Sequence, residues 1–312
     1  MIQKLKDEIA KVVIGHEGLI DAMIIALLSR GHILVEGVPG VAKTTAVNAM
    51  AAALGFDFKR VQFTPDLLPS DIIGNEILDL KSNEYKIKHG PIFTNLLLAD
   101  EINRSSPKVQ SALLEAMAEG QVTIGEESFA LQEPFMVLAT ANPIDQEGTY
   151  ELPEASLDRF MVKVVVGYNT PEEELLIMEM SDRKKFDKIN QVMGKTELER
   201  LQEELEEVHI DDALKRYIIE IIETTRDPKA FGLEEIAQYI EFGASPRGTI
   251  ATYRASKAQA LLNGRNFVTP ADIAKSLYLT LPHRIKLSYQ AAIDGIESRT
   301  LIEKILIHTA AP

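Results

Sequence analysis

One stretch of the chain combines glycines, a lysine and a threonine in the order that is typical of a phosphate-binding loop. It follows a short apolar run at 33–35 and leads into an alanine-rich helical pattern at 45–54, which is the context this motif needs. Glycines let successive backbone N–H groups point at phosphate oxygens, and the helix N-terminus adds partial positive charge. The residues predicted to contact bound phosphate are Gly37, Val38, Pro39, Gly40, Val41, Ala42, Lys43, Thr44 and Thr45.

Lys43 and Thr44 carry the chemistry expected of this loop. A lysine at this position reaches the β- and γ-phosphates, and the hydroxyl of the next residue ligates Mg²⁺. Ala42 stands where the usual pattern has glycine, yet it keeps a small side chain where the backbone must approach phosphate. The alternative interpretation is a glycine-containing strand-to-helix turn with a solvated lysine.

Two acidic residues end a second apolar run. Asp100 and Glu101 follow 96–99, and at the carboxyl end of a strand they would face the ligand crevice of a parallel sheet. Asp100 would bind Mg²⁺ through its water shell, and Glu101 would polarise an attacking water. A third apolar run at 137–141 leads to Asn142, which could position that water or contact the γ-phosphate. Either run could instead end in an ordinary polar turn.

The composition indicates a globular protein of two domains. The 312 residues are 46% hydrophobic and 26% charged, which suffices for a sizeable core. There is no cysteine, so disulfides and thiolate metal sites are excluded. The formal net charge is −14, and acidic residues outnumber basic ones in both halves, which opposes a nucleic-acid partner without excluding a small basic patch. With no apolar run near the ~20 residues of a membrane span and no signal-peptide core, we expect a cytoplasmic protein.

Strands and helices alternate up to about residue 167, which predicts a parallel α/β sheet with helices on both faces. The predicted strands are 33–36, 58–62, 96–99, 135–140 and 162–166. The predicted helices between them are 17–29, 44–54 and 108–119. Alternation of apolar and polar residues also predicts hairpins at 76–88 and 121–131.

From residue 169 onward the pattern is helical. Helix starts are predicted at Pro171, Pro246 and Pro270, each of which follows a threonine or serine. Gly264 stands where a helix should end. The acid-rich stretch 199–208 has leucines three to four residues apart and predicts a solvated amphipathic helix. We therefore expect an α/β domain at 1–168 and an all-helical domain at 169–312.

Together the motifs resemble those of the AAA+ ATPases, and most closely those of the MoxR family. The resemblance covers essentially the whole chain in the family's order, and family members commonly have alanine where Ala42 stands. It is most specific at 36–44, 63–71, 99–104, 152–160 and 245–247. It implies a P-loop NTPase core at 1–168 and a helical lid at 169–312, with the element His283-Arg284 in the lid.

The resemblance also implies roles for single residues. Lys43 and Thr44 resemble the Walker A pair, and Asp100 and Glu101 resemble the Walker B pair. Asn142 matches the residue known as sensor 1.

Two arginines and an N-terminal segment have further implied roles. Arg247 matches sensor 2, the lid arginine that closes on the γ-phosphate. Arg159 resembles the arginine finger, which acts in trans on the nucleotide of a neighbouring subunit, although Arg104 could also face the subunit boundary. The segment 12–16 resembles the one that lines the adenine pocket, with Val13 as the contact and His16 as a bystander.

The family resemblance implies hydrolysis of ATP to ADP and phosphate, with ATP and Mg²⁺ as cofactors, by a homo-oligomeric ring that is expected to be hexameric. It further implies chaperone-like remodelling of client proteins, often with a partner that contains a von Willebrand factor A domain. Two alternatives stay open: a nucleic-acid-dependent motor, and a nucleotide-gated scaffold with little hydrolysis. The acidic charge opposes the first, and intact Glu101 and Arg159 oppose the second. Neither hairpin tip carries an aromatic residue, although Tyr85 lies close to the first, so threading of a polypeptide is left open.

Overall fold

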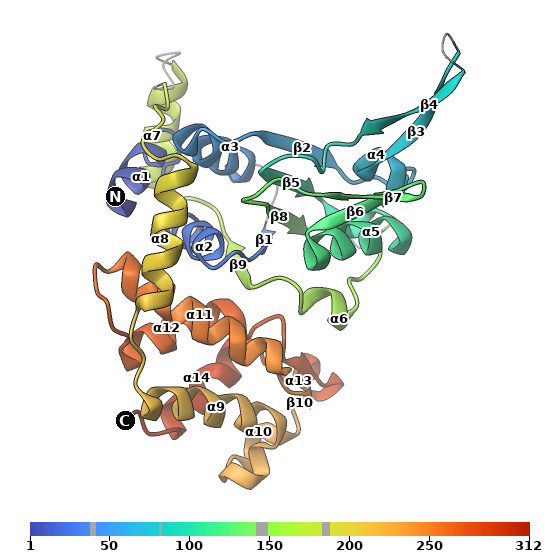
Figure 1. Cartoon of the computed structure of the whole chain (residues 1–312). Coiled ribbons are helices and arrows are strands. Elements are labelled where there is room, and N and C mark those ends of the chain that lie inside the picture. Colours follow the sequence, from blue (N-terminus) through green and yellow to red (C-terminus); the bar gives the residue numbers. More distant parts are fainter. Residues whose placement is uncertain (38–41, 81–82, 142–148, 183–187) are drawn as a thin grey trace. The chain divides into compact units, whose positions relative to one another are not determined.

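A five-stranded sheet organises the first half of the chain in the computed structural model, which describes residues 1–37, 42–80, 83–141, 149–182 and 188–312 (Figure 1). The strand order is β2-β5-β8-β1-β9, and the pairs β2–β5, β5–β8 and β8–β1 are parallel. The bounds are β1 Ile33–Gly37, β2 Phe58–Gln62, β5 Leu96–Asp100, β8 Met136–Ala141 and β9 Val162–Val166. All five predicted strands are confirmed to within one residue at each end.

The central strands β5 and β8 are buried along their length except at the last residue of each. Side chains of a strand alternate between the two faces, so burial of consecutive residues means that both faces are covered. Exposure returns at the carboxyl ends, where a parallel sheet presents its ligand crevice. The helices of this part of the chain are α1 Ile2–Ile9, α2 Glu17–Leu28, α3 Lys43–Leu54, α4 Pro69–Ile73, the 3₁₀ turn η1 Ile102–Arg104, α5 Pro107–Glu119 and α6 Glu154–Leu157.

Two antiparallel hairpins lie outside the main sheet, as predicted. The first pairs β3 (Gly74–Asp79) with β4 (Glu84–His89), and the second pairs β6 (Gln121–Ile124) with β7 (Glu127–Ala130). Figure 1 shows that β3 and β4 extend away from the sheet. Gly125 begins the turn of the second hairpin with a φ of 62°, a left-handed conformation that glycine adopts without strain.

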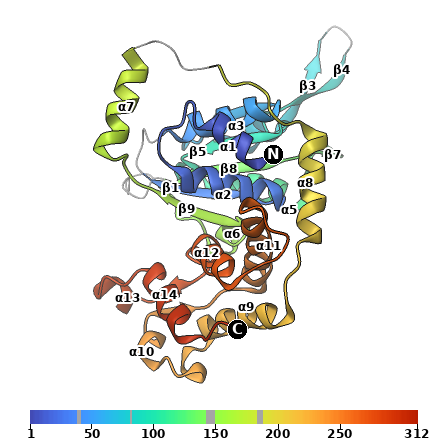
Figure 2. The same cartoon turned by 90° about the vertical axis from the view of Figure 1, so that its left-hand side faces the viewer.

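The second half of the chain is mainly helical. The predicted starts at Pro171, Pro246 and Pro270 are confirmed as the first residues of helices. The elements are α7 Pro171–Asp182, α8 Lys195–Glu207, α9 Asp212–Arg226, the 3₁₀ turn η2 Pro228–Phe231, α10 Glu234–Ala237, α11 Pro246–Leu262, α12 Pro270–Thr280, α13 Tyr289–Ile293 and α14 Ser298–His308. Helices α11 and α12 pack side by side (Figures 1 and 2). One feature was not predicted: β10 (Ile240–Phe242) and β11 (Lys286–Leu287) form a small antiparallel sheet.

Contacts divide the molecule into two compact units that are interleaved along the chain. The first comprises Met1–Met23, His32–Leu152 and Val164–Leu198, and the second comprises Ile24–Gly31, Pro153–Lys163 and Glu199–Pro312. The second unit has its own apolar core, in which Ile221, Ile236 and Leu277 are among the fully buried side chains. Each unit comprises three separate segments, so no single position in the chain divides one unit from the other. The domain boundary expected between residues 168 and 169 therefore stays a prediction.

Candidate functional site

The turn from β1 to α3 carries the predicted phosphate contacts. Lys43 is the first residue of α3, and its Nζ donates to the backbone oxygen of Gly37 at the end of β1, at 2.7 Å. Thr44 and Thr45 follow on the exposed side of the helix start, where hydroxyls can reach a bound ligand. Four of the predicted contacts, Val38, Pro39, Gly40 and Val41, lie outside the described residues.

Two positions in this turn impose backbone requirements. A Cβ on Gly37 would lie 2.3 Å from the backbone oxygen of Val166 in β9, so only glycine fits between the strands. Ala42, the N-cap of α3, has a φ of 50° in the left-handed region. Alanine there costs on the order of 1 kcal/mol relative to glycine, which explains why glycine is usual at this position.

Asp100 and Glu101 lie at the carboxyl end of β5, as predicted, and a residue of the neighbouring strand β8 joins them. The Thr140 hydroxyl donates to Asp100 Oδ1 at 2.6 Å and accepts from the Glu101 backbone N–H at 2.8 Å. Thr140 is buried, so it fixes both acidic residues against the sheet. Glu101 has a φ of 57°, a conformation that costs energy for a residue other than glycine and that clusters at functional sites.

The two carboxylates pair with cationic and amide groups that sequence reasoning missed. Arg60 Nη2 lies 2.6 Å from Asp100 Oδ2, and Gln62 Nε2 donates to Glu101 Oε2 at 2.8 Å. Both partners come from β2, in which Gln62 stands opposite Asp100 in the parallel register. Sequence reasoning could have identified them from the polar residues at positions 60 and 62, because residues two apart on a strand face the same side of the sheet.

Arg104 also belongs to this cluster. Its Nε lies 3.2 Å from Glu101 Oε2, so it has a partner within its own subunit. The prediction that it faces a subunit boundary stays open.

The electrostatics of Lys43 reflect the same neighbourhood. Burial lowers the pKa of Lys43 from its ordinary value, while the negative charges of Asp100 and Glu101 oppose that shift. The lysine and the two acids lie at the same edge of the sheet, because β1 and β5 both pair in parallel with β8. A cation and two carboxylates at the carboxyl edge of a parallel sheet are suited to bind a phosphate together with a hard cation, which prefers oxygen ligands.

The segment predicted to line an adenine pocket is tied to the start of α7. Val13 is buried. The side chain of Asn169 donates from Nδ2 to the backbone oxygen of Ile14 at 3.0 Å, and its Oδ1 lies 3.0 Å from His16 Nε2. This arrangement gives His16 a structural partner. The remaining residue predicted for this site, Asn142, lies outside the described residues.

Arg247 and Arg159 belong to the second unit, where Asp158 is the common neighbour. Ser245 is the N-cap of α11, and its hydroxyl accepts from the Arg247 backbone N–H at 3.1 Å and donates to Asp158 Oδ2 at 2.9 Å. Arg247 Nη1 lies 3.9 Å from the same carboxylate oxygen. Asp158 immediately precedes Arg159, so the structure brings the predicted lid arginine next to the segment that carries the predicted finger.

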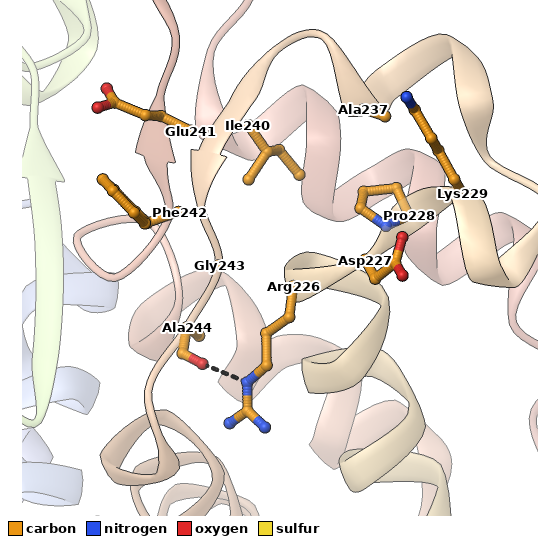
Figure 3. Close-up of a pocket in the computed structure, with 10 residues that line it drawn as sticks. All are labelled: Arg226, Asp227, Pro228, Lys229, Ala237, Ile240, Glu241, Phe242, Gly243 and Ala244. Atoms are coloured by element: carbon orange, nitrogen blue, oxygen red, sulfur yellow. Dashed lines mark hydrogen bonds between the residues drawn. The ribbon is translucent and has the colours of Figure 1, made fainter.

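The backbone that leads into α11 is anchored on the end of α9. Arg226 Nε donates to the backbone oxygen of Ala244 at 2.8 Å (Figure 3), and the Ala244 N–H donates to Thr225 Oγ1 at 3.0 Å. A Cβ on Gly243 would lie 2.4 Å from the backbone oxygen of Thr225, so this approach requires glycine. The start of α11, which bears Arg247, is therefore fixed within its unit.

A pocket of about 520 Å³ adjoins this anchor. Its lining residues, drawn in Figure 3, are Arg226, Asp227, Pro228, Lys229, Ala237, Ile240, Glu241, Phe242, Gly243 and Ala244. None of them belongs to the predicted nucleotide site.

Across the described parts of the chain, the helices are too short or too polar to cross a membrane.

Comparison with known families agrees with the motifs. The family described as "ATPase family associated with various cellular activities (AAA)" matches residues 32–162, and the AAA lid domain matches residues 234–305. The first match includes strands β1, β2, β5 and β8 with both acids, and the second covers about half of the helical part of the chain, including α11 and α12.

Individual relatives cover nearly the whole chain. The chaperone MoxR1 of Mycobacterium tuberculosis is 43% identical over 306 residues, which are 98% of this chain and 81% of the relative. The uncharacterised protein YeaC of Bacillus subtilis is 43% identical over 313 residues, covering 100% of this chain and 95% of the relative. A crystal structure of a candidate ATPase from Cytophaga hutchinsonii has a TM-score of 0.94 and 46% identity, covering 100% of this chain and 94% of that one.

Proposed function

The chain belongs to the MoxR family of AAA+ ATPases, and from this membership we propose that it hydrolyses ATP to ADP and phosphate with Mg²⁺, as a hexameric ring. The observation that carries the proposal is the sheet topology, which places Lys43, at the helix start after β1, and Asp100 and Glu101, at the end of β5, at one edge of the sheet. A strand-to-helix loop with a lysine and a neighbouring strand that ends in two acids is the pairing that phosphoryl transfer to water requires.

The residues present fit Mg·ATP. Lys43 supplies a cation at the start of α3, and Thr44 and Asp100 supply the oxygen donors that Mg²⁺ prefers. Asp100 is held by Thr140 and Arg60, which fits a carboxylate that holds the metal through water. Bound Mg²⁺ would supply neutralisation of the negative charge on the transferred phosphate.

Glu101 is the residue we assign to the attacking water. A carboxylate within hydrogen-bond reach of that water orients it and accepts its proton. Glu101 Oε2 is held by Gln62 and Arg104, so the carboxylate has a defined position beside the sheet. Asn142, which follows β8, is the proposed second contact of the water or of the γ-phosphate.

We assign a further lowering of the activation barrier of hydrolysis to Arg159 of a neighbouring subunit. An arginine supplied in trans stabilises the charge of the transition state and is worth about 10³–10⁵ in rate in other NTPases. The proposal therefore makes hydrolysis depend on assembly. Arg247 is the proposed lid arginine, which would close on the γ-phosphate.

We propose that the protein uses the energy of ATP hydrolysis to remodel client proteins. We also propose that it does so in the cytoplasm. The support is the relative MoxR1, which is named a chaperone. A partner with a von Willebrand factor A domain is proposed on the family resemblance alone.

The test separates binding from turnover with one substitution. Wild-type protein should release phosphate from ATP only when Mg²⁺ is present. Glu101→Gln removes the base but keeps the shape, so it should bind a fluorescent ATP analogue with unchanged affinity while phosphate release falls at least 100-fold. A Glu101→Gln protein that still hydrolyses ATP at the wild-type rate would remove Glu101 from this role. A wild-type protein that does not bind the analogue would refute the proposed function.

A further inference from the structure

Arg284 is a buried arginine of the second unit whose hydrogen bonds go almost entirely to one short segment. Its side chain is 2% exposed. Nε donates to Asp158 Oδ1 at 2.9 Å, and Nη2 donates to the backbone oxygens of Asp158 at 3.2 Å and of Phe160 at 2.7 Å. Nη1 donates to the backbone oxygen of Met161 at 3.0 Å and to that of Thr280.

These contacts use all the N–H groups of the side chain. A guanidinium has five N–H donors, and four of the five bonds of Arg284 end on residues Asp158 to Met161. A lysine has three donors on one nitrogen and no planar fork, so it could not make the same set of bonds. The arginine is therefore specific to this segment, beyond being a counter-charge for Asp158.

The hydrogen bonds of Arg284 hold the backbone on both sides of Arg159. The two carbonyls that receive Nη2 belong to the residues immediately before and after it. His283 adds a bond, with Nε2 2.8 Å from the Phe160 oxygen. A backbone carbonyl oxygen can only accept, so the ring nitrogen Nε2 is the donor in this bond. Burial, together with the positive charge of Arg284, lowers the pKa of His283 well below its ordinary value.

The same segment is tied to the second unit at two further points. Lys286 Nζ lies 2.8 Å from Glu154 Oε1, and the Ser245 hydroxyl donates to Asp158. Contacts accordingly assign Pro153–Lys163 to the second unit, together with α11. The segment with Arg159 and the helix start with Arg247 thus share one compact body.

Asp158 lies between Arg284 and Arg247 and interacts with both. Its Oδ1 is held by Arg284, while its Oδ2 faces Ser245 and lies 3.9 Å from Arg247 Nη1. A movement of Arg247 would therefore change the charge that surrounds the Asp158 carboxylate, and Asp158 immediately precedes Arg159.

We propose that Arg284 is a positioning residue for the trans arginine: it fixes the backbone around Arg159 to the lid, so that Arg159 and Arg247 move as one body. The position of the finger presented to the neighbouring subunit would then follow the position of the lid. This inference rests on the proposed function, because it needs a ring in which Arg159 completes the neighbour's site.

Mixed rings test the trans role of Arg284 separately from any effect on its own subunit's site. Arg159→Ala subunits keep a nucleotide site but supply no finger, and Lys43→Ala subunits supply a finger but bind no nucleotide. Each alone should be inactive, and their mixture should hydrolyse ATP. When the finger donor carries both Lys43→Ala and Arg284→Lys, the restored rate should fall at least tenfold, because misplacement by about 1 Å can cost roughly 10²-fold.

The matched control donor is Lys43→Ala with Arg265→Lys. Arg265 forms another ion pair of the same unit, with Asp272 at 2.6 Å, and its hydrogen bonds go to Asp272 and to the Phe267 backbone oxygen, away from residues 153–163. This donor should restore hydrolysis in full. If Arg284→Lys prevents folding, as judged by circular dichroism, Asp158→Asn replaces it in the donor and should cause the same loss.

The outcomes separate the two proposals. If the simple mixture of Arg159→Ala and Lys43→Ala is inactive, the trans finger is wrong and the role of Arg284 falls with it. If that mixture is active and the Arg284→Lys or Asp158→Asn donor restores the same rate as the Arg265→Lys control, only the role of Arg284 is overturned. A loss confined to the Arg284 and Asp158 donors supports it.

Discussion

The acidic edge of the sheet and the buried arginine of the second unit both pair carboxylates with arginines, but they do so in different surroundings. At the sheet edge, Arg60 is 49% exposed and its partner Asp100 is 18% exposed. In the second unit, Asp158 is also 18% exposed, but the Arg284 side chain is only 2% exposed and bonds to several backbone oxygens as well as to Asp158.

The difference indicates different tasks. Exposed ion pairs contribute little to stability, typically below about 1 kcal/mol, and exchange partners readily. Breaking a buried pair leaves an uncompensated charge and costs about 3–5 kcal/mol. Loss of the Arg60–Asp100 ion pair at the sheet edge should therefore cost little stability, whereas loss of Arg284 should destabilise the second unit.

The largest expected effect is at the sheet edge, where Lys43 is predicted to bind phosphate. Lys43→Ala should abolish nucleotide binding, because the phosphate charge loses its counter-ion at the start of α3. The measurement is a titration with a fluorescent ATP analogue, with Lys59→Ala as a control, since Lys59 is exposed on β2. An unchanged affinity of Lys43→Ala would refute the loop assignment.

The next effect compares the two candidate trans arginines. Arg159→Ala should leave nucleotide binding by the monomer intact and reduce turnover of the assembled protein by about 10³-fold or more. Arg104→Ala should cause a smaller loss, since Arg104 pairs with Glu101 of its own subunit. If Arg104→Ala alone gave the large loss at unchanged binding, the finger would have to be reassigned to Arg104.

A stability measurement sharpens the comparison between the clusters themselves. Arg284→Met should lower the free energy of unfolding by about 3–5 kcal/mol, and Arg60→Met should lower it by less than about 1 kcal/mol. Urea unfolding followed by circular dichroism measures both. Equal losses for the two variants would contradict the view that only the Arg284 cluster is a fixed structural element.

The smallest expected effect is a pH dependence from His32, outside both clusters. His32 is fully buried, and burial lowers its pKa to about 4; Nε2 lies 3.1 Å from the Met117 backbone oxygen, and Nδ1 accepts from the Val137 N–H at 3.1 Å. The unfolded chain binds the proton below about pH 6.5, whereas the folded chain resists it until about pH 4. This contribution to stability is thus complete above pH 6.5 and is lost as the pH falls toward 4, by about 2 kcal/mol between pH 7 and pH 5.

The control for this prediction is His32→Gln, whose amide can donate to Met117 and accept from Val137 without titrating. Its unfolding free energy should change less between pH 7 and pH 5 than that of the wild type. An identical pH dependence in both proteins would show that other groups are responsible.

Sequence reasoning predicted those parts of the structure that depend on local patterns. Apolar runs located the five strands of the sheet, and a threonine or serine before proline located the starts of α7, α11 and α12. The acids at the end of β5 were predicted because a strand and its last residues are adjacent in the chain. Residues 38–41 and Asn142 lie outside the described residues, so the contacts predicted for them stay predictions.

Features that depend on distant residues could not be predicted in this way. The pairing of Arg60 with Asp100 follows from the position of β2 beside β5, which no local pattern specifies. The bonds from Arg284 to Asp158 span 126 residues. For the same reason, sequence order assigned Arg159 to the first domain, whereas contacts group its segment with the second unit.

The most direct test of the central claim is Mg²⁺-dependent ATP hydrolysis as a function of protein concentration, with the mass of the particles measured in the same samples. The account predicts that specific activity rises as the mass increases to that of a ring, since each site needs Arg159 from a neighbour. A protein that binds ATP but hydrolyses it at the same specific rate as a monomer and as a ring would contradict the account.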